Sequence, residues 1–164
     1  MSFNIRKMKS EDLQKFWTAL NSVAQEGKYL LDTQAPAENK MAVFLQAVVE
    51  NNYPAVFAEE AGDIIGWADM IPQQKPSMKH SASLGMGVVK AHRGKGLGEA
   101  LLTQVMEMAE REGVTRMELE VFATNLPAIA LYRKHNFNLE GTKVNAVFID
   151  GTFVDMHVMA RLTD

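Results

Sequence analysis

The sequence predicts a mixed α/β domain of the α+β kind, with its elements in the order βααβββαβαββ. Some segments carry apolar residues at helical spacing, whereas others alternate apolar and polar residues as half-buried strands do. Glycine and proline mark the turns between these segments. The chain has 164 residues, of which 47% are hydrophobic and 23% charged. This size and composition predict one globular domain over residues 1–164.

The N-terminal half predicts a strand, two helices and a hairpin. The first strand is expected over Phe3–Arg6, and Ser10 is expected to cap the first helix. A second helix is expected to begin near Pro36. The apolar residues of the two helices recur at helical spacing: Leu13, Phe16, Trp17, Leu20 and Val23, then Met41, Phe44, Leu45, Val48 and Val49. Two strands over Tyr53–Glu60 and Asp63–Ile71 are expected to form a hairpin.

The C-terminal half continues the alternation with four strands and two helices. Strands are expected over Ser81–Val89, Arg116–Phe122, Thr142–Ile149 and Phe153–Leu162. A helix that begins at Leu97 is expected to end at Gly113, and Pro127 is expected to open another that reaches His135. Asp150-Gly151 between the last two strands is the strongest short-range hairpin signal in the chain.

Composition excludes several function classes. The chain has no cysteine, which rules out disulfides, cysteine zinc sites and a cysteine nucleophile. The formal net charge of −3 disfavours general nucleic-acid binding. No segment is apolar enough to span a bilayer, and the first residues lack a signal-peptide pattern. We therefore expect a cytoplasmic protein that binds neither membrane nor nucleic acid.

The most informative segment lies between the strand that ends near Val89 and the helix that begins at Leu97. It contains Arg93-Gly94-Lys95-Gly96-Leu97-Gly98. A helix N-terminus presents free N–H groups and partial positive charge, and glycines let this backbone approach an anion closely. Arg93 and Lys95 add formal positive charge. The segment predicts a phosphate or diphosphate site, and the simpler alternative is a tight strand-to-helix turn with a basic rim.

Two common phosphate motifs do not fit this segment. Glu99 occupies the position where a nucleotide P-loop or a dinucleotide fingerprint beginning at Gly94 needs glycine. What does fit is the pattern [RQ]-x-x-G-x-[GA], and here the chain resembles the GNAT superfamily of N-acetyltransferases. In that family the loop holds the diphosphate of acetyl-CoA.

A second block strengthens the resemblance. Asn125-Leu126-Pro127-Ala128-Ile129-Ala130-Leu131-Tyr132-Arg133-Lys134-His135-Asn136-Phe137 is similar to the family's N-x-x-A-x-x-L-Y-x-x-x-G-F motif. Asn136 stands where glycine is common, and asparagine tolerates the left-handed backbone of such a turn. The resemblance implies the GNAT fold, a mixed central sheet of about seven strands with helices on both faces. The tail resembles bacterial members that acetylate amino acids or similar small amines.

The resemblance also implies a set of residues that bind acetyl-CoA. The diphosphate is expected on the backbone of the loop, and the pantetheine arm on the strand before it, in a gap between two strands. Asn125 matches a family asparagine that contacts the cofactor, and it can also cap its helix. The expected set is Met86, Gly87, Val88, Arg93, Gly94, Lys95, Gly96, Leu97, Gly98, Glu99, Asn125 and Tyr132. No metal site is expected, because no pair of histidines has the spacing of a metal-binding helix motif.

Two side chains are predicted to be catalytic. Tyr132 matches the family's general acid, and a tyrosine keeps its proton at neutral pH and can donate it to a departing thiolate. Glu120 matches a position that some members use as the base. It is equally compatible with a solvated strand residue, and Glu118, Asp69 and His80 are further candidates. Tyr29, Trp67 and Phe122 are candidates to line an acceptor pocket or to pack in the core.

The sequence therefore predicts an N-acetyltransferase that moves an acetyl group from acetyl-CoA to a primary amine. The acceptor is expected to be a small molecule such as an amino acid, with direct attack in a ternary complex. Two alternatives stay open: acetylation of a protein N-terminus or lysine, and a non-catalytic module that binds acyl-CoA and regulates another protein. A homodimer is expected by analogy with the family.

Overall fold

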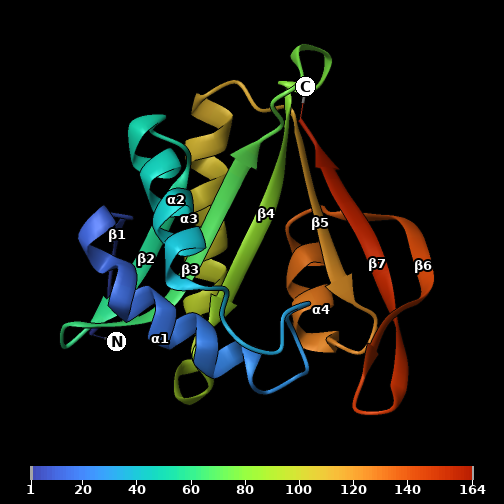
Figure 1. Ribbon diagram of the computed structural model, residues 1–164. Helices are drawn as coiled ribbons and strands as arrows, with labels where there is room; N and C mark the ends of the chain where they lie inside the picture. Colours follow the sequence, from blue (N-terminus) through green and yellow to red (C-terminus); the bar gives the residue numbers. More distant parts are fainter. Residues whose placement is uncertain (1, 164) are drawn as a thin grey trace.

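The computed structural model describes residues 2–163, and Met1 and Asp164 lie outside the described residues. Its strands form one mixed sheet of seven in the order β1-β2-β3-β4-β5-β7-β6 (Figure 1). The strands are β1 (Asn4–Lys7), β2 (Ala55–Glu60), β3 (Asp63–Pro72), β4 (Ser81–Val88), β5 (Arg116–Phe122), β6 (Asn138–Ile149) and β7 (Thr152–Leu162). The α-helices are α1 (Leu13–Ala24), α2 (Glu38–Glu50), α3 (Leu97–Arg111) and α4 (Leu126–Lys134). The predicted element order is confirmed.

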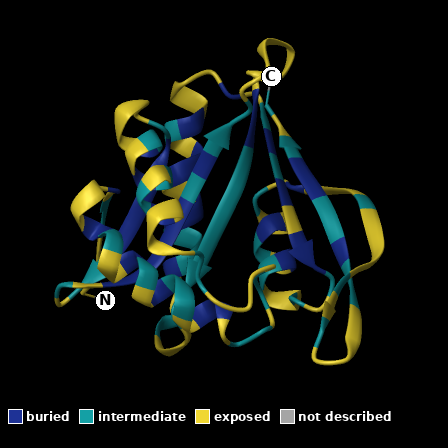
Figure 2. Ribbon diagram, viewed as in Figure 1, coloured by how far each residue is buried: buried dark blue, intermediate teal, exposed yellow. Residues whose placement is uncertain are grey.

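The helices cover both faces of the sheet, and each face has its own hydrophobic core. Leu101 and Leu102 of α3 and Ile129 of α4 belong to one core. Phe16 of α1 and Leu45 of α2 belong to the other. Figure 2 shows the buried positions concentrated along the central strands and along the inner sides of the helices. Alternation along the strands sends neighbouring side chains to opposite cores, as the period of a strand requires.

Three turns that the sequence predicted have the expected left-handed backbone. Asp150 and Gly151 both have positive φ, at 52° and 75°, in the turn that joins β6 to β7. Gly113 has a φ of 85° just after α3. Asn136 has a φ of 67° just after α4, so asparagine makes the left-handed turn that glycine would otherwise make. The motif's departure from glycine at this position therefore leaves the turn intact.

Several element boundaries differ from the prediction, most by one or two residues, and two of the differences have a structural reason. Ser10 does not cap an α-helix, because Ser10–Asp12 forms a 3₁₀ turn and α1 begins at Leu13. The carboxylate of Asp12 accepts hydrogen bonds from both terminal nitrogens of Arg6 at 2.8 Å. Strand β6 begins at Asn138, four residues before the expected Thr142. A register shift between Leu139 and Gly141 interrupts the alternation that would have marked this start.

Candidate active site

The centre of the site is a gap between β4 and β5. These parallel strands pair only from Ser81 with Arg116 to Ser83 with Glu118. Beyond this point they diverge, and Figure 1 shows them together near the C-terminus and apart at their other ends. The gap leaves backbone N–H and C=O groups of β4 and β5 unpaired by each other. An extended ligand can therefore bind there as an added strand.

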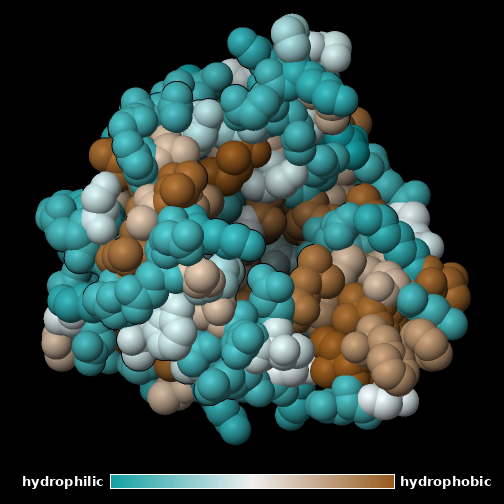
Figure 3. All heavy atoms as spheres, viewed as in Figure 1, coloured by the Kyte–Doolittle hydropathy of each residue, from teal (hydrophilic) through white to brown (hydrophobic). Residues whose placement is uncertain are grey.

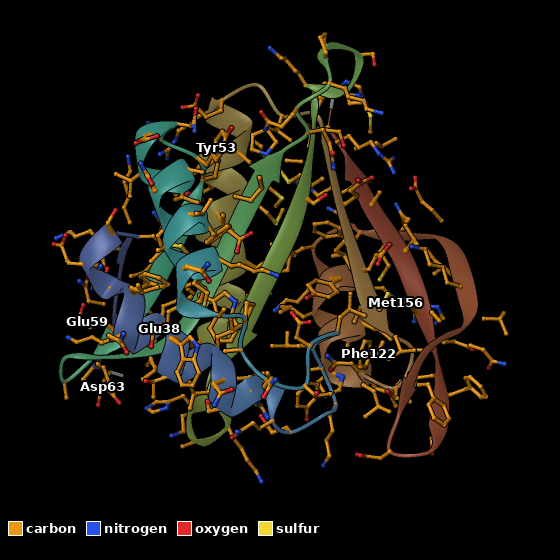
Figure 4. The ribbon with its side chains drawn as sticks, in the orientation of Figure 1. Glu38, Tyr53, Glu59, Asp63, Phe122 and Met156 are labelled. Atoms are coloured by element: carbon orange, nitrogen blue, oxygen red, sulfur yellow. The ribbon has the colours of Figure 1, made fainter. Side chains whose placement is uncertain are left out.

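A cavity of about 770 Å³ occupies this gap and reaches both faces of the sheet. Its lining is mainly apolar, and Figure 3 shows a hollow with hydrophobic atoms near the centre of the face that it presents. Phe122 of β5 and Met156 of β7 are paired across their strands, lie close together in Figure 4, and both line the cavity. Pockets of this size hold small molecules and cofactors.

The glycine-rich loop forms one end of the cavity. Gly94 and Gly96 have φ values of 74° and 83°, a left-handed backbone that residues with side chains rarely adopt. Gly96 is the N-cap of α3, and no side chain of the described residues caps this end. A Cβ at Gly94 would have no atom within 4 Å. The loop therefore presents open helix N–H groups, which suit a phosphate or diphosphate.

The two basic side chains of the loop differ in their exposure and in their hydrogen bonds. Lys95 is exposed and donates to the carbonyl of Ala91. Arg93 donates to both carboxylate oxygens of Glu26 at 2.8 and 2.6 Å, and to the carbonyl of Val88 at 2.9 Å. Its guanidinium also lies 4.6 Å from the centre of the Tyr29 ring. Arg93 therefore joins the end of α1 to the loop and shapes it, and the hydrogen bonds to Glu26 lower the pKa of that carboxyl.

Most of the other predicted donor-binding residues line the same cavity, whereas Lys95 and Leu97 do not. Gly87 of β4 packs so closely that a Cβ there would lie 2.4 Å from the Trp67 ring. Asn125 accepts a hydrogen bond from the Ala128 backbone at 3.4 Å, so it does cap α4. The glycine loop and α4 meet where the Glu99 carboxylate accepts hydrogen bonds from Lys134 and His135 at 3.0 Å. The predicted residues in the cavity lining are Met86, Gly87, Val88, Arg93, Gly94, Gly96, Gly98, Glu99, Asn125 and Tyr132.

Tyr132 is the best-placed proton donor in the cavity. It is 8% exposed, lines the cavity from α4, and packs against Phe137 with the ring centres 5.8 Å apart. Burial raises the pKa of its phenol to about 12. The hydroxyl is therefore protonated throughout the neutral range, as a general acid must be.

Glu120 lies on the opposite face of β5 from Leu119 and Val121, as the alternation predicted. It lines the cavity, yet its side chain is 42% exposed and its carboxylate is paired with Lys143. Trp67 is a core residue, whereas Tyr29 and Phe122 line the cavity. His80 is exposed.

Several parts of the site carry no motif in the sequence. The segment between α1 and α2 contributes Leu30, Leu31, Asp32, Gln34 and Ala35, and no motif marked it. Its shape depends on long-range hydrogen bonds, such as Asn21 accepting from the Ala35 backbone at 2.9 Å. Glu26 was also missed, since nothing in the local sequence links it to Arg93.

The described residues contain no cluster of three or more histidine, cysteine, aspartate or glutamate side chains with the geometry of a metal site. Among residues 2–163, no helix combines the length and the apolar character needed to cross a membrane.

Comparison with known proteins places these features in a family. The model of the acetyltransferase (GNAT) family matches residues 11–137. An L-amino acid N-acetyltransferase of Escherichia coli, AaaT, is 36% identical over 102 residues, which span 62% of this chain and 63% of the relative, less than two thirds of its length. An L-methionine sulfoximine/L-methionine sulfone acetyltransferase of Pseudomonas paraeruginosa is 28% identical over 97% of this chain and 94% of its own.

A solved structure shares the fold. The phosphinothricin acetyltransferase of Sinorhizobium meliloti, crystallised in complex with acetyl-CoA, superposes with a TM-score of 0.90 at 25% identity, over 99% of this chain and 89% of that one.

Proposed function

The chain belongs to the GNAT acetyltransferase family, and from this premise we propose that residues 1–164 form one domain that transfers an acetyl group from acetyl-CoA to a primary amine. The observation that carries the proposal is the divergence of β4 and β5 over a cavity that the glycine-rich loop closes at one end and Tyr132 lines. This arrangement suits a ligand with an anionic end, an extended middle and a reactive end. Acetyl-CoA has that shape.

We assign the donor-binding residues from this geometry. The backbone of Gly94, Lys95, Gly96, Leu97, Gly98 and Glu99 binds the diphosphate, with the exposed Lys95 ammonium nearby. Arg93 holds the loop in shape through Glu26. The strand edge at Met86, Gly87 and Val88 binds the pantetheine arm, and Asn125 flanks it from the start of α4. No atom lies within 4 Å of a Cβ at Gly94, so the loop has room for the phosphates.

The chemistry needs a proton donor and a proton acceptor in this cavity. Acetyl-CoA supplies an activated acetyl group as a thioester, with coenzyme A as the leaving group. Tyr132 donates its phenolic proton to the departing sulfur. The acceptor ammonium must also lose a proton, and Glu120 is one candidate base whose side chain lines the cavity. The chain has no cysteine, which excludes a cysteine acyl-enzyme and favours direct attack of the amine on the thioester in a ternary complex.

We propose a small amine, such as an amino acid, as the acceptor. Two relatives with full or partial coverage carry amino-acid substrates in their names. The described segment between α1 and α2 also covers part of the cavity, which favours a small acceptor over a protein chain. Acetylation of a protein terminus or lysine is the alternative, and it would need a groove open to a polypeptide. A module that binds acyl-CoA without turnover is the other alternative.

A panel of amines with acetyl-CoA, read by release of free thiol, tests this function. The panel contains L-methionine sulfone, L-phosphinothricin, the common L-amino acids, a peptide with a free N-terminus and a lysine peptide. We expect release with at least one free amino acid or analogue and none above background with the peptides. Preferential turnover of a peptide would favour the protein-acetylating alternative. Binding of acetyl-CoA without turnover of any amine would favour the regulatory module.

We also propose that the protein forms a homodimer through the β6–β7 hairpin. Phe148 and Phe153 face each other across the two strands with ring centres 4.9 Å apart, and they are 62% and 60% exposed. Strand β6 is an edge of the sheet, and Val144 on it is also exposed. Figure 3 shows hydrophobic atoms gathered on this side of the molecule. Exposed aromatic pairs on an edge strand are typical of an interface.

Light scattering in solution tests the dimer. The wild type is expected at twice the 18.2 kDa chain mass. Phe148→Glu is expected at the monomer mass, because a charge in the hydrophobic contact disfavours association. Val43→Glu is the control, since Val43 is equally exposed but lies on α2. A wild-type protein that is monomeric at tens of micromolar would contradict the proposal.

We place the protein in the cytoplasm, where an enzyme that uses acetyl-CoA meets its donor.

A further inference from the structure

A carboxylate without a partner lies where β4 and β5 separate. Asp69 of β3 pairs in register with Gly85 of β4, two residues beyond Ser83, the last residue of β4 that pairs with β5. A Cβ on Gly85 would lie 3.1 and 3.2 Å from the two carboxylate oxygens of Asp69. The carboxylate therefore lies directly over the Gly85 backbone, and Gly85 itself lines the cavity.

Asp69 and Tyr132 lie on opposite sides of the sheet. Tyr132 lines the cavity, whereas Asp69 lies just behind the lining, against Gly85. Trp67, two residues before Asp69, packs in the core beneath α1 and α2, whereas Ala68 and Met70 pack in the core beneath α3 and α4. The alternation of the strand places Asp69 on the side of α1 and α2. Tyr132 belongs to the core on the other side. A proton acceptor and a proton donor thus stand on either side of the space proposed for the thioester.

No neighbouring group stabilises the negative charge of the Asp69 carboxylate. Its neighbours in register are Ala55 and Gly85, and Trp67 and Ile71 flank it along β3. Within residues 2–163, no ion pair or hydrogen bond engages its side chain, and α1 and α2 pack on this face with hydrophobic residues. The burial raises the pKa of the Asp69 carboxyl to about 7.

The other charged groups on this sheet face belong mainly to β5. Glu118 and Glu120 lie there, and Arg116 is bound to Glu118 and to Glu140. Glu120 is half exposed and paired with Lys143, so water and an ammonium already stabilise its charge. Asp69 is half-buried and unpaired, and its carboxyl has a pKa near neutrality, which are the properties of an effective base.

We propose that Asp69 accepts the proton of the acceptor ammonium and holds the resulting amine over Gly85, next to the thioester. The proposal rests on the acetyl-transfer function proposed above. It also assigns the direction of approach: the acceptor enters from the side of α1 and α2, and the donor is held from the side of α3 and α4.

The proton balance of the step is complete. Asp69 takes one proton from the ammonium and later releases it to solvent. The neutral nitrogen forms the new C–N bond to the acetyl carbon, and the C–S bond of the thioester breaks. Tyr132 gives its proton to the sulfur, and the second proton that the nitrogen loses restores the phenol.

Asp69→Asn is the central test, because asparagine keeps the shape and removes the base. The probe is the amine of the panel that the wild type acetylates fastest, with L-methionine sulfone tried first. For the wild type we expect kcat/KM to rise with pH through a pKa near 7. We expect Asp69→Asn to lower kcat/KM about 100-fold at pH 7. The rise of kcat/KM near pH 7 should be absent in this variant. The deficit should shrink at alkaline pH, where more of the acceptor is already neutral.

Asp63→Asn is the matched control. Asp63 is the first residue of the same strand and is exposed, and Figure 4 shows it far from Phe122 and Met156 of the cavity. Its removal should leave the pH profile unchanged. Gly85→Ala is a second variant, since it retains the carboxylate but crowds it by a few tenths of an ångström. We expect Gly85→Ala to lower kcat/KM and to keep the step near pH 7.

A second readout does not depend on activity. The charged form of Asp69 is disfavoured in the folded protein, so the folded state binds more protons than the unfolded state between about pH 4 and pH 7. Stability therefore falls as pH rises through this window. Asp69→Asn should raise the melting temperature at pH 8 and leave it nearly unchanged at pH 4, and both proteins should gain stability from acetyl-CoA.

The possible failures are distinguishable. If the wild type acetylates an amine and Asp69→Asn keeps its kcat/KM within threefold with the same pH step, Asp69 is not the base. If Glu120→Gln loses the pH step instead, Glu120 is the base. If the wild type acetylates no amine, the proposed function fails and the role of Asp69 fails with it.

Discussion

Replacement of Tyr132 by phenylalanine is expected to lower kcat at least 100-fold while leaving the affinity for acetyl-CoA within about threefold of the wild type. The variant removes one hydroxyl and keeps the ring, which packs against Phe137 in the core. Without the phenolic proton, the sulfur must leave as a thiolate in a mainly apolar cavity. A charge that develops in such surroundings is costly, so the transition state for C–S cleavage loses its stabilisation.

The raised pKa of Tyr132 adds a prediction about pH. Because burial raises the pKa of this phenol to about 12, its proton stays in place at neutral and mildly alkaline pH. Wild-type kcat should therefore show no decline that belongs to Tyr132 below about pH 10. The thiolate lies in the same apolar surroundings, which raise its own basicity and so favour proton transfer from the phenol.

Single-turnover kinetics and acetyl-CoA titrations of both proteins test this expectation. Tyr53→Phe is the matched control, because the Tyr53 hydroxyl accepts a hydrogen bond from Gln74 at 3.2 Å outside the cavity lining. That variant should keep its turnover. An unchanged kcat in Tyr132→Phe would remove Tyr132 from the mechanism.

The second large effect concerns the glycine-rich loop. Gly94→Asp is expected to weaken acetyl-CoA binding about 100-fold relative to Gly94→Asn. Both side chains enter open space at a φ of 74°, and asparagine and aspartate tolerate this backbone equally. The two variants therefore differ mainly by one negative charge. At about 6–7 Å from a diphosphate, that charge costs about 2–3 kcal/mol, which corresponds to roughly 100-fold in affinity.

Calorimetric titration of acetyl-CoA at two salt concentrations is the measurement. The difference in acetyl-CoA affinity between the two variants should be smaller at high salt, because ions screen the repulsion between the aspartate and the diphosphate. Equal affinity of Gly94→Asp and Gly94→Asn would contradict the assignment of the loop to the diphosphate. A thermal melt without ligand checks that both variants fold alike.

The sequence was informative where structure depends on local chemistry. Asp150-Gly151, Gly113 and Asn136 predicted turns correctly, because each needs a left-handed backbone that few residues tolerate. The stripes on α1 and α2 predicted their buried faces for a similarly local reason, except that Val49 at the end of α2 is exposed. The glycine-rich loop and the Asn125–Phe137 block located two sides of the cavity, since each is a short contiguous segment.

The rest of the site depends on contacts between distant segments. Arg93 and Glu26 are 67 positions apart, and only the folded chain makes them partners. Asp69 was one of four candidate bases by sequence, and its register with Gly85 distinguishes it. The start of β6 was missed because a register shift removes the alternation on which strand prediction depends. Patterns along one strand report neither its partner nor its register.

The short pairing of β4 with β5 predicts that a bound donor stabilises the protein. A sheet that is open between its two halves gains stability from any molecule that fills the opening, by an amount that grows with the logarithm of the concentration of that molecule. Acetyl-CoA would then act as a missing piece of the fold as well as a reactant. In a starved cell with little acetyl-CoA, more of the protein would be partly open and exposed to proteases. The abundance of the enzyme would thereby follow the supply of its own donor.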